Sequence, residues 1–291
     1  MRGNAAEHEL VAPGSLPAVL DLIASGPGQW TPIAGGTELM VAFAAGRLSA
    51  GRLVSLWDLR ELRFIKTHSD KVIIGAGTTF SDLRATAIIA SEFPLLNTAA
   101  GWIGAVANQT RATIGGNLVN GSPAADSSPA LLVYDAEVEL ISVHGKRRIP
   151  YTEFHTGYKQ NAMNADELVF AIHLPRRFAK HRQYIRKVGT RRAMAISKVA
   201  LGAAALMDEG LIHEIRLAAA SLAPFPVRLH KTEAALIGNS INRVVIESAR
   251  RALLAEARPI DDIRSTGEYR RQVGANLLEE FLQSLAAELP Q

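Results

Sequence analysis

The sequence predicts an α+β fold, with a two-lobed N-terminal domain over residues 1–175 and a C-terminal domain over residues 176–291. Three observations carry this prediction. A strand–turn–helix–strand order over residues 31–56 is typical of a small α/β lobe. Strand patterns joined by turns over residues 64–174 indicate a second lobe built on a mainly antiparallel sheet. From His230 onward the pattern is helical, which favours a C-terminal domain that combines a small antiparallel sheet with helices.

The first lobe, about residues 1–57, begins with a helix whose apolar side chains recur at helical spacing on one face. Two short buried strands and a second helix should follow. In chain order we expect a helix over Leu16–Ser25, a strand over Thr31–Ala34, a helix over Glu38–Gly46 and a strand over Leu53–Leu56.

The second lobe, about residues 58–175, should hold paired strands on either side of a helical stretch. Ser81 is expected to cap the first of these helices. In chain order we expect strands over Phe64–Thr67 and Lys71–Gly75, helices over Ser81–Ala90 and Pro94–Val106, and strands over Leu131–Val133, Glu137–Val143, Lys146–Ile149 and Leu168–Leu174. The C-terminal domain should contain strands over Tyr184–Val188 and Ile212–Ala220, then helices over Lys231–Ile237, Arg243–Ala257 and Tyr269–Leu289.

Composition excludes several classes of protein. The chain has no cysteine, so it holds no disulfide, no Cys-ligated zinc and no iron–sulfur cluster of its own. The eight histidines are scattered, which argues against a metal site. Residues 1–10 lack the apolar core of a secretory signal, and no run approaches the roughly twenty apolar residues of a membrane span. We therefore expect a cytoplasmic protein.

The net charge is +4, and basic residues gather between Arg176 and Arg192. This stretch fits a solvated or subunit-facing surface, a contact for bound phosphates, or a nucleic-acid surface. It contains few stacking aromatics and matches no nucleic-acid motif, so we expect no nucleic-acid partner.

Two glycine-rich turns, about eighty residues apart, carry the main functional signal. The first reads Ile33-Ala34-Gly35-Gly36-Thr37-Glu38, and the second reads Thr113-Ile114-Gly115-Gly116-Asn117 and is followed by Asp126. Backbone without a Cβ atom can approach an anion closely, and successive N–H groups can point at its oxygens. If the two turns converge, their amides would hold the two phosphates of a dinucleotide. The Gly75-Ala76-Gly77 segment is not a Rossmann fingerprint, because Phe80 stands at its third glycine position.

These two motifs resemble those of the FAD-binding medium subunits of molybdenum hydroxylases, such as carbon monoxide dehydrogenase and xanthine dehydrogenase. The resemblance covers nearly the whole chain. It continues in Phe154-His155-Thr156-Gly157-Tyr158, in Asp166-Glu167-Leu168, and in Lys187-Val188-Gly189 with Arg191-Arg192-Ala193, in the family's order and rough spacing.

The resemblance implies FAD as cofactor. The positions that match the family's FAD contacts are Ile33, Ala34, Gly35, Gly36, Thr37, Glu38, Ile103, Thr113, Ile114, Gly115, Gly116, Asn117, Asp126, Leu168 and Lys187. It implies that Asp126 accepts hydrogen bonds from the adenosine part and that Lys187 stabilises charge on the reduced ring. From the residues alone, Asp126 also fits an Asx turn and Lys187 a solvated strand lysine.

Three further positions complete the implied site. Glu38 stands where Asp is common and should point away from the phosphates, which would repel it. Ile103 lies where some members have an aromatic near the flavin, and its side chain has no π face for stacking. Thr113 begins the second motif, where it can pack, cap or line the ring.

By resemblance, the chain carries electrons within a molybdenum hydroxylase complex. A large molybdopterin subunit would oxidise the substrate, a small subunit with two [2Fe–2S] clusters would relay electrons, and FAD on this chain would pass them to an acceptor such as NAD. Nothing in the sequence stands out as a catalytic acid/base pair. Two alternatives stay open: a stand-alone flavin oxidoreductase, and an FAD-free nucleotide-binding or assembly module.

Overall fold

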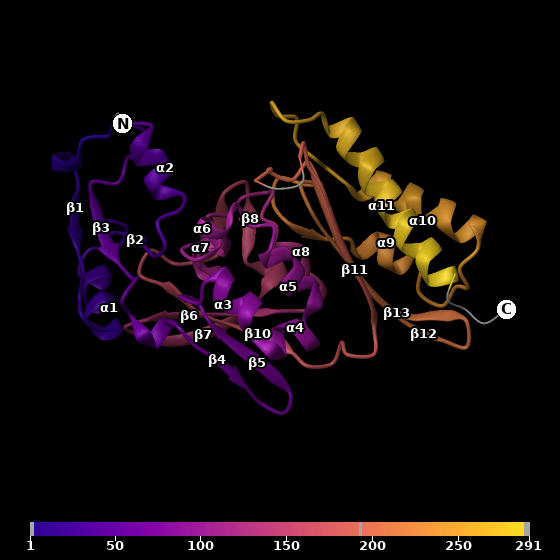
Figure 1. The fold of residues 1–291 in the computed structure, drawn as a ribbon, viewed down its shortest axis with the longest axis horizontal. Helices are drawn as coiled ribbons and strands as arrows, with labels where there is room; N and C mark the ends of the chain where they lie inside the picture. Colours follow the sequence, from indigo (N-terminus) through magenta and orange to yellow (C-terminus); the bar gives the residue numbers. More distant parts are fainter. Residues whose placement is uncertain (1–2, 192–193, 288–291) are drawn as a thin grey trace.

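The computed structural model describes residues 3–191 and 194–287 and confirms the predicted α+β fold (Figure 1). In this part of the chain the strands form a three-stranded, a five-stranded, a four-stranded and a two-stranded sheet. Arg192 of the basic stretch, Ala193 of the third family motif and Leu289, the expected end of the last helix, lie outside the described residues.

The first lobe is a small parallel sheet with the strand order β1-β3-β2, and α1 packs against it. Leu16, Val19, Leu20 and Ile23 of α1 are buried together with Val54 of β3, as the helical spacing predicted. The elements are β1 (Glu9–Val11), α1 (Leu16–Ala24), β2 (Thr31–Ile33), α2 (Leu39–Ala44) and β3 (Arg52–Ser55), after a 3-10 helix over Ala5–Glu7. This cluster also contains Leu62 and Leu168, so the core of the first lobe continues into the second.

The second lobe has an antiparallel sheet with the order β4-β5-β10-β6-β7. Its strands are β4 (Ile65–Thr67), β5 (Lys71–Gly75), β6 (Glu137–Ser142), β7 (Gly145–Pro150) and β10 (Leu168–Pro175), and β8 (His155–Gly157) and β9 (Gln160–Asn161) form a separate hairpin. Its helices are α3 (Phe80–Ala85), α4 (Ala87–Glu92), α5 (Pro94–Ala100), α6 (Val106–Gln109), α7 (Ile114–Val119) and α8 (Ser128–Val133), with 3-10 helices over Arg60–Leu62 and Tyr151–Glu153. One large core joins α3, α4, α5, α7 and α8 to one face of the sheet.

The helical stretch of this lobe is more broken than predicted. Thr79, not Ser81, caps α3, because Thr79 and Asp82 exchange side-chain and backbone hydrogen bonds in a capping box. The extended backbone of Thr86 then ends α3 and starts α4. The helix predicted over Pro94–Val106 ends at Ala100, and Gly104 beyond it has a φ of +51° that continues no helix.

The strand predicted over Leu131–Val133 is wrong, because these residues belong to α8. A three-residue apolar run is compatible with a buried strand and with a buried helix, and periodicity alone does not separate the two. Pro129 in the first turn favours the helix, since proline fits the start of a helix.

The C-terminal domain has an antiparallel sheet in the order β11-β12-β13-β14. Its elements are β11 (Arg182–Val188), β12 (Val199–Asp208), β13 (Leu211–Ala220), β14 (Val227–Arg228), α9 (His230–Ala234), α10 (Arg243–Glu256) and α11 (Gly267–Ala287). One face of this sheet forms a core with α10 and α11, whereas Ala204 and Ala218 join the core of the second lobe. The small residues of β12 allow α8 to approach, since a Cβ atom on Gly202 would lie 3.3 Å from Pro129.

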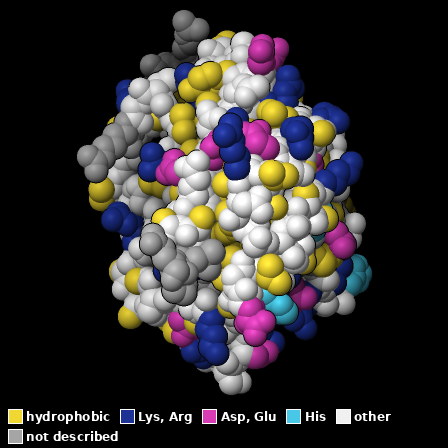
Figure 2. Space-filling model, turned by 90° about the vertical axis from the view of Figure 1, so that its right-hand side faces the viewer, with side chains coloured by type: hydrophobic (Ala, Val, Ile, Leu, Met, Phe, Trp, Pro, Cys, Tyr) yellow, Lys and Arg dark blue, Asp and Glu magenta, His cyan; other side chains and the backbone are white. Residues whose placement is uncertain are grey.

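The basic stretch is largely paired with carboxylates. Arg176 binds Glu92, Arg177 binds Asp135 and Glu214, and Arg186 lies 3.4 Å from Glu280. Figure 2 looks onto the right-hand side of Figure 1, where α10 and α11 lie, and shows Lys and Arg interspersed with Asp and Glu. None of the helices in the described ranges has the length and apolar character that a membrane crossing needs.

Candidate functional site

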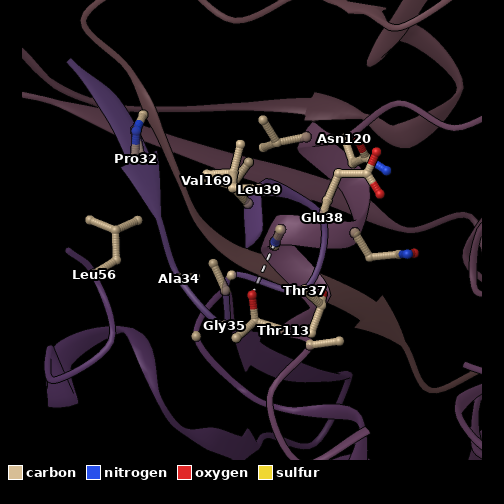
Figure 3. Close-up of a pocket in the computed structure, with 18 of the residues that line it drawn as sticks. Pro32, Ala34, Gly35, Thr37, Glu38, Leu39, Leu56, Thr113, Asn120 and Val169 are labelled. Atoms are coloured by element: carbon tan, nitrogen blue, oxygen red, sulfur yellow. Dashed lines mark hydrogen bonds between the residues drawn. The ribbon is translucent and has the colours of Figure 1, made fainter. Parts of the chain in front are cut away.

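A cavity of about 350 Å³ lies between the two lobes, where the end of β2 faces α7 and the start of β10 (Figure 3). Its volume falls in the range of about 300–1,000 Å³ that is usual for small-molecule sites. The two glycine segments both contribute to its wall. The first segment also touches the chain just before the second one, because a Cβ atom on Gly35 would lie only 1.7 Å from the carbonyl oxygen of Arg111.

The first glycine segment is an open turn that presents its amides. From Ala34 to Leu39, no backbone N–H donates a hydrogen bond to any residue that the structure describes. Gly36 has a φ of +72°, a conformation that glycine adopts without strain. Consecutive unpaired amides in a turn form a concave binding site for an anion. Ala34, Gly35, Gly36 and Thr37 all line the cavity, as the first motif predicted.

The second glycine segment is not a turn, which corrects the prediction. Ile114–Val119 forms α7, and Thr113 caps it by accepting a hydrogen bond from Gly116 N at 3.2 Å (dashed line in Figure 3). The other three amides, of Ile114, Gly115 and Asn117, donate to Thr78 O, Ala76 O and Thr113 O. The expectation that these four amides are free for a phosphate is therefore wrong, since each already has an acceptor within the chain.

The second segment offers a smooth surface and side chains instead of amides. A Cβ atom on Gly116 would meet only Thr113 Oγ1, at 3.0 Å, so its absence leaves the cavity wall flat at this point. The amide oxygen of Asn117 accepts from Ser127 Oγ at 2.6 Å. This bond leaves the Asn117 amide nitrogen as a donor on the cavity wall, without an acceptor among the described residues.

Apolar side chains form the rest of the wall. Ile103 and Leu168, two of the positions that match the family's FAD contacts, line the cavity together with Met163 and Val169. Ile114 does not line it, because its side chain is fully buried in the core of the second lobe. Ile33 ends β2 and lies under the turn, where its side chain would be 3.5 Å from a Cβ atom on Gly36.

Glu38 is the single titratable side chain among the described residues that line the cavity. Its carboxylate lies 3.8 Å from Lys159 Nζ and is well exposed. In Figure 3 its side chain extends away from the turn at Gly35, in the direction that repulsion from a phosphate would favour.

Asp126 and Lys187 lie beside the cavity and bind each other rather than lining it. Lys187 Nζ is 2.6 Å from Asp126 Oδ2, and both side chains are about nine-tenths buried. Ser197 donates to the other carboxylate oxygen, Oδ1, at 2.5 Å. Burial raises the pKa of Asp126, against the opposing effects of the Lys187 ammonium and the Ser197 hydroxyl. The roles implied for Asp126 and Lys187 as direct FAD contacts stay predictions.

Comparison with known proteins identifies the chain. A family model described as "FAD binding domain in molybdopterin dehydrogenase" matches residues 6–177, and one described as "CO dehydrogenase flavoprotein C-terminal domain" matches residues 184–285. The chain belongs to this family. It is an FAD-binding subunit of the molybdenum hydroxylases, so the resemblance seen in the motifs, the cofactor FAD and the assignment to an oxidoreductase are confirmed.

Relatives span nearly the whole chain. It is 30% identical, over 94% of both proteins, to the xanthine dehydrogenase FAD-binding subunit of Escherichia coli O157:H7. It is 29% identical to the glyceraldehyde dehydrogenase medium chain of Sulfolobus acidocaldarius, over 83% of this chain and 85% of that one. Among solved structures, it matches carbon monoxide dehydrogenase from Hydrogenophaga pseudoflava that lacks the Mo-pyranopterin moiety, with a TM-score of 0.92 and 25% identity over 98% of this chain and 99% of that one.

The residues present fit FAD. The unpaired amides of the first turn suit a pyrophosphate, the flat wall at Gly116 leaves room for a ligand, and the apolar side chains suit a ring.

Sequence reasoning missed several residues of the wall, among them Ala76, Gly77 and Asn120. Asn120 would have been found had α7 been predicted, because it lies three residues after Asn117 on the same helix face. The Gly75–Gly77 segment lacks the Rossmann pattern, and its backbone still reaches the cavity.

Proposed function

We propose that this chain is the electron-transfer subunit of a multi-subunit molybdenum hydroxylase. Its partners would be a large subunit with molybdopterin and a small subunit with [2Fe–2S] clusters, and its acceptor an external molecule such as NAD⁺. A cytoplasmic location belongs to the same proposal, as does the division into an FAD-binding domain, residues 1–175, and a C-terminal domain, residues 176–291. The observation that carries the proposal is the row of unpaired amides from Ala34 to Leu39 on the wall of a cavity between two lobes.

The chain's own residues bind and orient the cofactor. When bound, FAD supplies a ring that takes up electrons singly and releases them as a pair. The backbone amides of Ala34 to Thr37 would hold the pyrophosphate, and the side-chain amide nitrogen of Asn117 would donate a further hydrogen bond. Ile103, Leu168 and Val169 would exclude water from the ring.

The character of the wall favours a carrier over a stand-alone oxidoreductase. An enzyme that activates its own substrate needs acid or base groups within hydrogen-bond reach of the reacting atoms. In the described part of the wall, Glu38 is the one such group, and it turns away from the glycine turn toward Lys159. The relatives named above as a subunit and a medium chain support the assembly into a larger enzyme.

The test is a titration of the purified chain with FAD and, in parallel, with FMN, which has the same ring and lacks the pyrophosphate and adenosine. We expect saturable quenching of flavin fluorescence at one site per chain for FAD, and binding at least about 100-fold weaker for FMN, about 3 kcal/mol. Equal affinity for both would show that the amide row does not hold the pyrophosphate.

A second measurement addresses the partners. The tagged chain, isolated from its native cell, should copurify with proteins that contain molybdenum and iron, in a fixed ratio to flavin. A flavin-loaded chain that purifies alone under conditions that preserve complexes would favour the stand-alone oxidoreductase. A chain that binds no flavin, whether it is purified alone or with its partners, would favour the assembly module.

A further inference from the structure

A buried polar cluster joins the C-terminal domain to the back of the cavity wall. Asp126 follows α7, Lys187 lies on β11, and Ser197 precedes β12. Asp126 receives Lys187 Nζ at 2.6 Å on one oxygen and Ser197 Oγ at 2.5 Å on the other. Ser197 is fully buried and Asp126 is 8% exposed, so water does not replace these bonds.

This cluster is connected to the cavity at two points. Lys187 Nζ also donates to Trp102 O at 3.5 Å, and the next residue, Ile103, lines the cavity. Asp126 is followed by Ser127, whose hydroxyl donates to the Asn117 amide oxygen and thereby orients the free amide nitrogen of Asn117. A shift of the Asp126 carboxylate would therefore displace both Ile103 and Asn117.

A second set of hydrogen bonds holds the same segment, and it comes from Ser221, the residue after β13. Ser221 N donates to Pro123 O at 2.7 Å, and Ser221 Oγ donates to Ser197 O at 3.1 Å. Ser221 has a φ of +65°, which is uncommon for a residue other than glycine and is kept where the surrounding bonds require it. Ser197 therefore takes part in both sets of bonds. Its carbonyl oxygen accepts from Ser221, and its hydroxyl donates to Asp126.

We propose that Ser197 is a positioning residue of the FAD site: its hydroxyl fixes the Asp126–Lys187 pair, and this pair fixes the wall at Asn117 and Ile103. Both oxygens of Asp126 are occupied by groups of the chain itself. Lys187 and Ser197 both belong to the C-terminal domain, so this domain contributes to the FAD site through the Asp126 carboxylate. This inference rests on the proposed FAD site.

The test is Ser197→Ala, which removes one hydroxyl and leaves every residue of the cavity wall unchanged. Thr232→Val is the matched control. Thr232 is also fully buried in the C-terminal domain, and its hydroxyl also donates to a carboxylate, Glu256 at 2.8 Å, but in α9, away from the cavity. Ser197→Cys serves as the partial rescue variant, because its thiol keeps a weak donor at this position.

Three quantities are measured for each variant: the FAD dissociation constant, the absorption spectrum of the bound flavin, and the Tm of the FAD-free chain. We expect Ser197→Ala to raise the dissociation constant about tenfold and to shift the flavin spectrum. Thr232→Val should lower the Tm by about as much as Ser197→Ala does, but it should leave the FAD affinity and the flavin spectrum as in the wild type. Ser197→Cys should recover part of the affinity.

Two results would overturn the inference. One is wild-type affinity and spectrum in Ser197→Ala. The other is an equal loss of affinity in Ser197→Ala and Thr232→Val, which would mean that both act through general stability. Failure of the wild-type chain to bind FAD is a separate outcome, because it removes the proposed site itself before any variant is compared.

Discussion

The two glycine segments have nearly the same sequence pattern and opposite structures. Ile33–Glu38 is an open turn whose amides from Ala34 onward are unpaired. Thr113–Asn117 instead starts a capped helix, and the amides from Ile114 to Asn117 are bonded within the chain. Both lie on the wall of one cavity. The first therefore supplies hydrogen-bond donors to a ligand, and the second supplies a flat surface and the side chains of Thr113 and Asn117.

The comparison shows that a glycine pair indicates that something lies close to the backbone. The pattern does not tell whether this is another part of the chain or a ligand. Position 35 needs glycine because the backbone of Arg111 leaves no room for a Cβ atom. Position 115 needs glycine because a Cβ atom there would lie 2.6 Å from the Cβ atom of Ala76. These two glycines serve the fold. Gly116 has no such neighbour on its open side, so its missing side chain serves the cavity.

The largest effect is expected for Gly35→Ala, which would break the contact between Gly35 and the backbone of Arg111, just before the second segment. The new Cβ atom would overlap Arg111 O at 1.7 Å, and backbone atoms on both sides would have to move. We expect a loss of about 3 kcal/mol in the free energy of unfolding, together with loss of FAD binding. Gly51→Ala is the control in the same lobe, because nothing lies within 4 Å of its added Cβ atom. Urea unfolding measures the stability of both variants. Equal stability of Gly35→Ala and Gly51→Ala would show that Gly35 does not lie against Arg111.

Gly116→Val sharpens the contrast, because it should remove the ligand and keep the fold. Valine is a better helix former than glycine, and the new Cβ atom meets only Thr113 Oγ1, at 3.0 Å. Its methyl groups would enter the cavity, so we expect FAD affinity to fall at least about 100-fold, roughly 3 kcal/mol. Fluorescence titration gives the affinity, and the Tm of the FAD-free chain should stay near that of the wild type. Unchanged FAD affinity would mean that the ligand does not pass this face of α7.

Much of this site could be predicted from the sequence, because glycine pairs and apolar spacing are local signals. The glycine pairs marked two segments that both contribute to the cavity wall, and the family resemblance added Ile103 and Leu168, which line it as well. They did not show which amides would be free. That depends on acceptors distant in sequence, such as Ala76 O and Thr78 O, and on whether Thr113 caps a helix.

The fold shows the same limit. Strands such as β10 and β13 were predicted because their patterns repeat over many residues. The ten-residue β12 was not predicted, and Leu131–Val133 is too short for its period to be read. Ser197 had no signal at all. Its role comes from its bond to Asp126, 71 residues away, which no local pattern encodes.

The smallest effect is expected from acid, and it should act through a buried network that follows the second segment in the chain. After Asp126 the chain enters a buried network in which Tyr151 donates to Ser128 at 2.7 Å and lies 3.1 Å from His155 Nε2. Burial lowers the pKa of His155 to about 4. Below pH 6.5, roughly the pKa of an unfolded histidine, the unfolded chain binds a proton that the folded chain does not, so the free energy of unfolding should fall by about 1–3 kcal/mol as the pH decreases toward 4. Urea unfolding at pH 7.5 and pH 5 measures this, and in His155→Gln the difference should shrink. An equal pH dependence in the wild type and in His155→Gln would show that acid acts at another group and that His155 does not carry the effect.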